Sequence, residues 1–237
     1  MAGTSTSTST GITLSGSVKT CARLGTATPE GFVFSRSHVL TSPRRASVSL
    51  CMRSVTEFFE YSINNILYQR EIYPPESFRR VAAYGLAMFV TTDDGLAGYL
   101  SNVLTQLHDW LEKGTVQRLV LVITSQVTGE TLERWVFDLH TDKAIGPDDK
   151  VDKSDKEIKS EIAAIQRQIT ASVTFLPLND EPCAFDLLVY TDSGVEVPKA
   201  WEESDPRLIV NSDEVKLRSF TTKVHKVDAA VSYKADA

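Results

Sequence analysis

The chain has 237 residues, of which 42% are apolar and 24% charged, and its net charge is −6. This composition suits one soluble domain with a sizeable core, or at most two small ones. The sequence contains no apolar stretch long enough for a membrane span or a secretion signal, so we expect an intracellular protein that does not bind membranes.

The charge is unevenly distributed along the chain. Residues 1–54 carry six basic side chains and one acidic one, so the remainder carries 19 basic and 30 acidic side chains, a net charge of −11. An acidic body repels phosphates, which argues against nucleic acid binding and favours protein partners. The Ser/Thr-rich, acid-poor start also fits a transit peptide, which leaves open an organelle-targeted α/β protein.

Motifs for catalysis and metal binding are missing. The cysteines are not in CxxC spacing and have no neighbouring histidines, which argues against a zinc site; they are Cys21, Cys51 and Cys183. No nucleotide-binding, hydrolase or metalloprotease motif occurs. The histidines lie in unrelated contexts, at positions 38, 108, 140 and 225. We therefore expect neither an enzyme nor a cofactor, and His108 beside Asp109 is interpreted as a solvated surface pair.

The first strongly periodic segment is "SVTEFFEYSINNILYQR" at 54–70. Its apolar residues have helical spacing, and they are Val55, Phe58, Phe59, Ile63, Ile66 and Leu67. Ser54 and Glu57 form a potential capping box, and Pro74 ends the segment, so a helix is predicted to begin at Val55.

Further elements follow in chain order. Residues 77–94 read as extended structure interrupted near Gly85, and 91–114 as an amphipathic helix with Gly114 suited to its C-cap. The segments 116–125 and 131–140 form a predicted hairpin whose first strand is central and whose second is more exposed. A charged loop at 141–156 precedes a third helix, whose apolar stripe runs from Ile158 to Val173.

The remaining chain is predicted to be β-rich. "CAFDLLVYT" at 183–191 alternates as a strand, and after it come the short extended pieces "GVEVP", "RLIVN", "VKLRSFTTKVHKV" and "AVSYK". None of these pieces has a helical period. His225 alternates along one of them and is expected to be structural.

A series of motifs in one order resembles a known family. They include "GITLSGS", "FFEYSINNILYQREIYP", "LHDWL", "GETLERWVFD", "RQITASVTFLPL", "VPKAWEES" and "VKLRSFTTKVHKV". Together they resemble the HORMA-domain family of spindle-checkpoint proteins called mitotic arrest deficient two, over residues 11–20 and 55–234. The translesion-polymerase and meiotic chromosome-axis HORMA proteins are the alternatives within the fold, and "WEES" and "LRSFTT" favour the checkpoint branch.

The resemblance implies an α+β fold, a HORMA domain at 55–237 with three helices packed on a mostly antiparallel sheet. Its C-terminal part, 193–237, corresponds to a mobile safety belt. In the closed state a partner peptide adds a strand to the sheet edge and the belt wraps across it, whereas in the open state the tail itself covers that edge. Ordering a random tail of this length costs more than a partner's contacts supply, so we expect a belt that is folded in both states.

The resemblance also assigns functional residues. Those expected at the partner-peptide site are Trp110, Phe185, Leu187, Tyr190 and Trp201. Those expected on the surface for self-dimerisation and regulator docking are Arg167, Gln168 and Arg218. From periodicity alone, core packing of Trp110 and Phe185 and an exposed helix charge at Arg167 remain open.

The implied function is a checkpoint adaptor that delays anaphase and acts in the nucleus, at the kinetochore and in the cytoplasm. Its expected partners are a coiled-coil kinetochore checkpoint receptor, the activator subunit of the anaphase-promoting complex and a checkpoint kinase-like complex partner. Others are a second copy in an open–closed dimer, and a remodelling ATPase with its HORMA adaptor. No catalysis is implied.

One segment departs from the family pattern. Joining Thr20 to Val55 gives an unbroken helix in which Val18 continues the apolar face, as in family members. Residues 1–20 are therefore the N-terminal tail and the start of the first helix, and 21–54 are an atypical insertion. We interpret this insertion as a translated intron or gene-model error, with a genuine looped-out insertion as the alternative.

Overall fold

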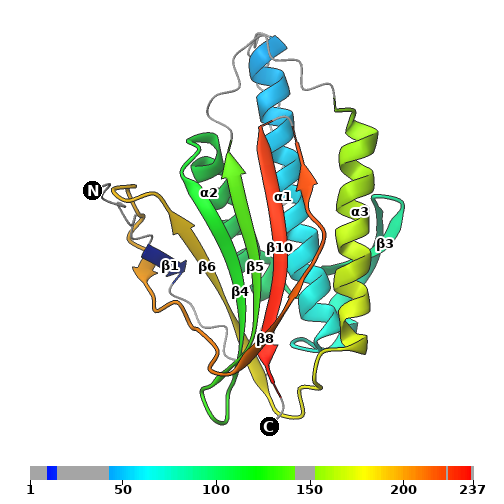
Figure 1. Cartoon of the computed structure of the whole chain (residues 1–237), viewed down its shortest axis with the longest axis vertical. Helices are drawn as coiled ribbons and strands as arrows, with labels where there is room; N and C mark the ends of the chain where they lie inside the picture. Colours follow the sequence, from blue (N-terminus) through cyan, green and yellow to red (C-terminus); the bar gives the residue numbers. More distant parts are fainter. Residues whose placement is uncertain (1–9, 15–42, 142–152, 223, 236–237) are drawn as a thin grey trace, which may run out of the picture.

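The computed structural model describes residues 10–14, 43–141, 153–222 and 224–235, with side chains from Met52 onward. Its strands form an eight-stranded antiparallel sheet and a separate two-stranded one. Three long helices pack on one face of the large sheet (Figure 1). This is the α+β architecture that the sequence predicts, and among the described residues no helix is long and apolar enough to cross a membrane.

The first helix, α1 (Pro43–Gln69), begins earlier than predicted. Ser54 and Glu57 lie inside it, so the predicted cap and start at Val55 are wrong. Pro43 suits the first helical turn, because a backbone N–H at that position would have no hydrogen-bond partner within the helix. The residues that follow it include Arg, Ala, Leu and Met, which favour helix, and extending a helix that already packs on a core avoids the cost of nucleation.

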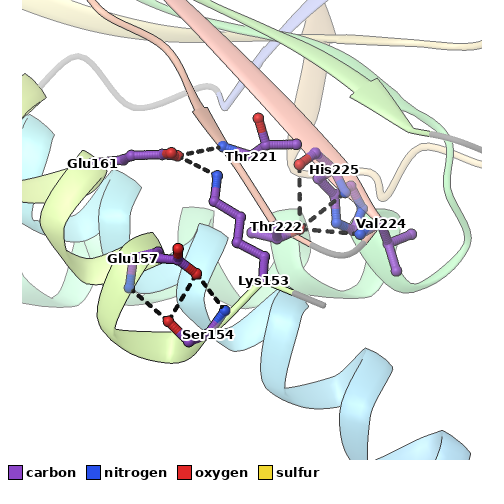
Figure 2. Close-up of polar contacts among 8 residues, drawn as sticks. All are labelled: Lys153, Ser154, Glu157, Glu161, Thr221, Thr222, Val224 and His225. Atoms are coloured by element: carbon purple, nitrogen blue, oxygen red, sulfur yellow. Dashed lines mark hydrogen bonds and ion pairs between the residues drawn. The ribbon is translucent and has the colours of Figure 1, made fainter. Parts of the chain in front are cut away.

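The second helix lies within the segment predicted for it, and the third begins at the end of the predicted charged loop. In α2 (Asp94–Glu112) the Asp93 carboxylate accepts a hydrogen bond of 2.7 Å from the Leu96 N–H, and Gly114 follows the helix with a φ of 64°. In α3 (Asp155–Ala171) Ser154 and Glu157 form a complete capping box (Figure 2). The apolar stripe predicted for α3 extends too far along the chain. Val173 lies beyond the helix, in the short 3₁₀ turn Ser172–Thr174, and is exposed.

The large sheet has the strand order β7-β1-β6-β4-β5-β10-β8, and β9 pairs with β10. Its members are β1 (Thr10–Leu14), β4 (Val116–Ser125), β5 (Thr131–Thr141), β6 (Cys183–Thr191), β7 (Trp201–Glu203), β8 (Ser212–Lys216), β9 (Phe220–Thr221) and β10 (His225–Lys234). The predicted hairpin is β4–β5, and β4 is central as expected. Since β10 covers β5, that strand is interior as well.

The smaller sheet is the hairpin of β2 (Phe78–Ala83) and β3 (Leu86–Thr91), preceded by the 3₁₀ turn Pro75–Ser77. Its two-residue turn has positive φ at Tyr84 (53°) and Gly85 (71°). A turn of this kind matches the twist of the flanking strands. The interruption predicted near Gly85 is therefore a tight hairpin turn.

The main core lies between the helices and one face of the large sheet. Phe58 and Phe59 of α1 make edge contacts with Phe137 of β5, each at a centroid distance of 5.7 Å. A buried ion pair adds polar attachment, because the Arg70 Nε donates to Glu133 at 2.7 Å and the other Glu133 oxygen accepts from the Trp135 indole at 3.0 Å. A second, smaller cluster occupies the opposite face, with Val120, Val122, Leu188 and Tyr190.

Two predicted extended pieces in the tail are not strands. "GVEVP" and "RLIVN" are irregular, and Leu208 and Val210 of the second piece are largely exposed. Cys21, His38, the insertion as far as residue 42 and most of the charged loop at 141–156 lie outside the described residues.

Candidate peptide-binding edge

The outer edge of β6 carries an added strand from the far end of the chain. β1 pairs antiparallel with β6, with Gly11 opposite Tyr190, Ile12 opposite Val189 and Thr13 opposite Leu188. The other side of β6 pairs with β4 along its whole length. Without β1, the backbone groups at this end of β6 would form an open sheet edge, which readily accepts another strand.

A strand of the tail covers the added strand from outside. β7 pairs antiparallel with β1, with Ile12 opposite Glu203 and Leu14 opposite Trp201. Trp201 is 7% exposed, and its ring meets that of Trp110 of α2 at a centroid distance of 5.0 Å and an angle of 67°. The chain that pairs with β6 is therefore enclosed between a sheet strand and the tail, with a tryptophan pair that fixes the tail to α2.

The two ends of β6 differ. Among the described residues no strand pairs with the outer edge of Cys183–Leu187, because β1 reaches only as far as Leu188. Here Phe185 lies between the rings of Tyr99 and Tyr73, at centroid distances of 5.8 and 6.2 Å. Burial raises the pKa of Tyr99, and the nearby Leu187 N–H opposes that shift. Aromatic side chains thus lie beside this part of the edge.

The predicted partner-peptide residues all lie at or beside β6, but on two faces. Phe185 and Leu187 point into the main core with Trp110 and Trp201, whereas Tyr190 belongs to the small cluster on the opposite face. There the Arg118 guanidinium lies 5.8 Å from the centre of the Tyr190 ring. Trp110 and Leu187 are fully buried, so the core packing left open for Trp110 is also present.

The tail reaches both edges of the sheet, and we call residues 193–235 the belt. In Figure 1 it leaves β7 at one edge and arrives at β8 and β10 at the other, where β10 pairs with β5 from His225 opposite Thr141 to Tyr233 opposite Glu133. Open and closed HORMA domains are expected to differ in which edge the tail covers. With β10 on β5 and a separate strand on β6, this is the arrangement expected of the closed state.

Contacts with α3 and α1 hold the belt at its second edge. The Arg218 N–H donates to the Gln168 side chain at 2.7 Å, and the Thr221 N–H donates to the Glu161 carboxylate at 3.1 Å (Figure 2). Between these two contacts Phe220 is fully buried, with its ring 4.7 Å from that of Phe58. The belt is therefore anchored by one aromatic side chain between two backbone hydrogen bonds.

The buried start of β10 explains the role of His225. A tight turn links Thr222 to His225, whose N–H donates to the Thr222 hydroxyl at 2.9 Å while its carbonyl accepts from the Thr222 N–H at 2.7 Å (Figure 2). Within the described part of the chain neither ring nitrogen has a hydrogen-bond partner, and burial lowers the pKa of His225. The imidazole is held neutral in a packed position, as a structural histidine would be.

The residues predicted for the dimer and regulator surface lie together on and beside α3. Gln168 and Arg218 are hydrogen-bonded partners, and Arg167 precedes Gln168 on the helix with its side chain exposed. Arg167 also lines a hollow of about 420 Å³ with Lys156 and Lys159. This surface is basic, in a chain body with a net negative charge.

His108 differs from its prediction. Its Nδ1 lies 3.3 Å from the Thr56 hydroxyl and its Nε2 lies 3.6 Å from Glu112. The imidazole is half-buried between α1 and α2 and does not form a solvated pair with Asp109. In the described part of the chain no three His, Cys, Asp or Glu side chains come together as a metal site would require.

Sequence reasoning missed two features of this site. Phe220 lay in a segment without a helical period, where no pattern distinguishes one buried aromatic from its exposed neighbours. The pairing of Thr10–Leu14 with β6 joins residues almost 180 positions apart, and the only signal in the sequence was the strand-like composition of "TGITL".

An α+β domain in which the C-terminal belt encloses an added edge strand is a peptide-trapping adaptor domain. Comparison with known proteins agrees with this class. The family model described as HORMA domain matches residues 52–225. The mitotic spindle assembly checkpoint protein MAD2A of Dictyostelium discoideum is 62% identical over 180 residues, which are 76% of this chain and 89% of that protein.

Two further comparisons point the same way. MAD2A of Homo sapiens is 56% identical over 181 residues, covering 76% of this chain and 88% of that protein. A chain in the crystal structure of the mitotic checkpoint complex is 45% identical, with a TM-score of 0.71 over 78% of this chain and 98% of that one. The chain therefore belongs to the HORMA domain family, in the branch of the mitotic spindle assembly checkpoint proteins.

Proposed function

We propose that the chain is a spindle assembly checkpoint adaptor that traps an extended partner peptide between β6 and its belt and thereby delays anaphase. The observation that carries this proposal is the strand added to β6 and enclosed by β7, with Trp201 against Trp110. Backbone ladder bonds supply affinity that does not depend on the exact peptide sequence. Nearby aromatic side chains, among them Tyr73, Tyr99 and Phe185, give side-chain selectivity.

Two trapped partners are proposed, the coiled-coil kinetochore checkpoint receptor and the activator subunit of the anaphase-promoting complex. Their site comprises Trp110, Phe185, Leu187, Tyr190 and Trp201. The high identity to checkpoint proteins over nearly nine tenths of their length favours these partners over those of the repair and meiotic HORMA branches. Trapping of this kind needs no catalysis and no cofactor.

A second surface is proposed for regulators. The group of Arg167, Gln168 and Arg218 on and beside α3, with its two arginines, fits an open–closed dimer, the remodelling ATPase with its HORMA adaptor, and the checkpoint kinase-like partner. Gln168 links the surface to the belt through its contact with Arg218, so a protein docked here would sense the belt position. We propose that the chain acts in the nucleus, at the kinetochore and in the cytoplasm, and that residues 21–54 are dispensable for this work.

Binding of defined peptides tests the trapping function. Fluorescently labelled peptides from the receptor and from the activator are titrated into the full chain and into a chain lacking residues 1–14, and dissociation is followed after dilution. We expect binding with slow dissociation, because the belt must open before the peptide leaves. Failure of both peptides to bind either form, while meiotic-axis or translesion-polymerase peptides bind, would reassign the protein to another branch.

A further inference from the structure

The strand that occupies the peptide-trapping edge is part of the protein itself. Thr10–Leu14 pairs on one side with Leu188–Thr191 of β6 and on the other side with Trp201–Glu203 of the belt. Ile12 and Thr13 are paired on both sides, so backbone groups pointing in either direction face another strand. This is the position in which a trapped peptide is expected, between the sheet edge and the closed belt.

The segment Thr10–Leu14 is shorter than the edge of β6 on which it lies. It covers β6 from Leu188 to Thr191 and leaves Cys183–Leu187 without a strand partner among the described residues. On that open stretch the ring of Phe185 lies 5.8 Å from that of Tyr99, measured between centroids. A longer peptide would gain ladder bonds along Cys183–Leu187 that Thr10–Leu14 does not make.

We propose that Thr10–Leu14 is an internal stand-in for the partner peptide, bound by its own chain. It holds the belt in the trapping arrangement without a partner, and an incoming peptide displaces it by first pairing at Cys183–Leu187. The inference rests on the proposed trapping function and adds to it a competitor within the same chain. The segment between Leu14 and Pro43 is long enough to allow this, since 28 residues span up to about 95 Å.

The size of the effect follows from competition within one molecule. A tethered segment has a local concentration on the order of a millimolar. We assign the untethered five-residue strand a dissociation constant on the order of 0.1 mM. The apparent Kd of any competing peptide is then raised about tenfold, and removal of the segment lowers it by the same factor.

A labelled synthetic peptide of residues 7–17 is the first probe, and it is titrated into four forms of the protein. These are the full chain, a chain lacking residues 1–14, the variant Ile12→Pro and the control Thr6→Pro. Proline removes a ladder hydrogen bond whichever way the amide of residue 12 points, because that residue is paired on both sides. Position 6 lies in the Ser/Thr tract before the paired segment.

The expected result is about tenfold tighter probe binding by the truncated chain and by Ile12→Pro than by the full chain and Thr6→Pro. Equal affinity in all four forms, or no binding to any, overturns the inference. If Thr10–Leu14 of a second copy occupied the edge instead, the full chain would be dimeric and its weaker binding of the probe would disappear on dilution. That outcome also overturns the inference.

Partner-derived peptides separate this inference from the proposed function. If they bind all four forms with equal affinity, trapping stands and the internal competitor is refuted. If they bind none while the residue 7–17 probe behaves as expected, the internal strand stands and the proposed partners are wrong. Hydrogen exchange at residues 10–14 supplies a direct reading, since these amides are expected to be protected in Thr6→Pro and to exchange freely in Ile12→Pro.

Discussion

Replacing Trp201 with alanine tests whether the tryptophan pair holds the belt closed. Trp201 is 7% exposed and packs on Trp110 at 5.0 Å. Truncating a buried tryptophan costs about 3–5 kcal/mol, of which about 1 kcal/mol is specific to an aromatic pair. Because β7 has three residues and, within the described part of the chain, pairs only with β1, we expect the cost to appear as local release of the belt rather than as unfolding of the domain.

A loss of about 3 kcal/mol from the closed state corresponds to roughly a hundredfold change in an equilibrium constant. Most of it is expected in the dissociation rate of a trapped peptide, measured by fluorescence anisotropy after adding excess unlabelled peptide. The urea midpoint of the domain should change little. Val197→Ala is the matched control, since Val197 is 37% exposed on the same part of the belt. An unchanged dissociation rate together with a large fall in the urea midpoint would refute the reasoning, because Trp201 would then be ordinary core.

Three further outcomes are expected. Phe220→Ala lowers the free energy of unfolding by about 3–5 kcal/mol, since Phe220 is fully buried against Phe58; a urea titration showing a loss under about 1 kcal/mol would contradict this. Stability is expected to fall as the pH drops below about 6.5, the ordinary histidine pKa. Burial lowers the pKa of His225 in the folded chain, so below pH 6.5 the unfolded chain binds a proton that the folded chain does not take up until a lower pH. The variant His225→Phe should flatten this part of the profile of urea midpoint against pH. Arg167→Ala leaves stability within about 0.5 kcal/mol because the side chain is exposed, but it weakens self-association measured by sedimentation; unchanged association would remove Arg167 from the proposed dimer surface.

Local patterns predicted the elements that pack by their own periodicity. The apolar stripes of α2 and α3 and the hairpin β4–β5 all follow from spacing within a dozen residues or so. The start of α1 did not, because the capping box at Ser54 is a valid start signal that a favourable preceding segment made unnecessary. A cap motif shows where a helix is able to begin, and the residues before it decide whether it does.

The placement of the tail could not be read from local pattern. Strands β7 (WEE) and β8 (SDEVK) are both short and acidic, yet the first lies at one edge of the sheet and the second at the opposite edge. Backbone hydrogen bonds are nearly the same at either edge, so the choice depends on a few side chains such as Phe220 and Trp201, whose pockets form only in the folded domain. The resemblance to the family predicted the belt, whereas periodicity alone predicted only short strands.

Deleting residues 21–54 should free the β6 edge, because the insertion supplies the length that β1 needs. Phe58 of α1 packs under β5, and β4 and β6 lie between β5 and β1. Three strand spacings make about 14 Å, and the helical layer lies about 10 Å from the sheet, so α1 and β1 are separated by about 17 Å.

When Thr20 is joined to Val55, Val18 becomes helical, and the chain from Leu14 to Val18 spans at most about 14 Å. The internal strand then no longer reaches its place, and the residue 7–17 probe should bind the deleted chain as tightly as the chain lacking residues 1–14. Replacing 21–42 with a Gly/Ser segment of equal length is the control and should keep the probe affinity of the full chain. If the deleted chain still binds the probe as weakly as the full chain, Thr10–Leu14 does not depend on the insertion, and the separation derived from the strand order is too large.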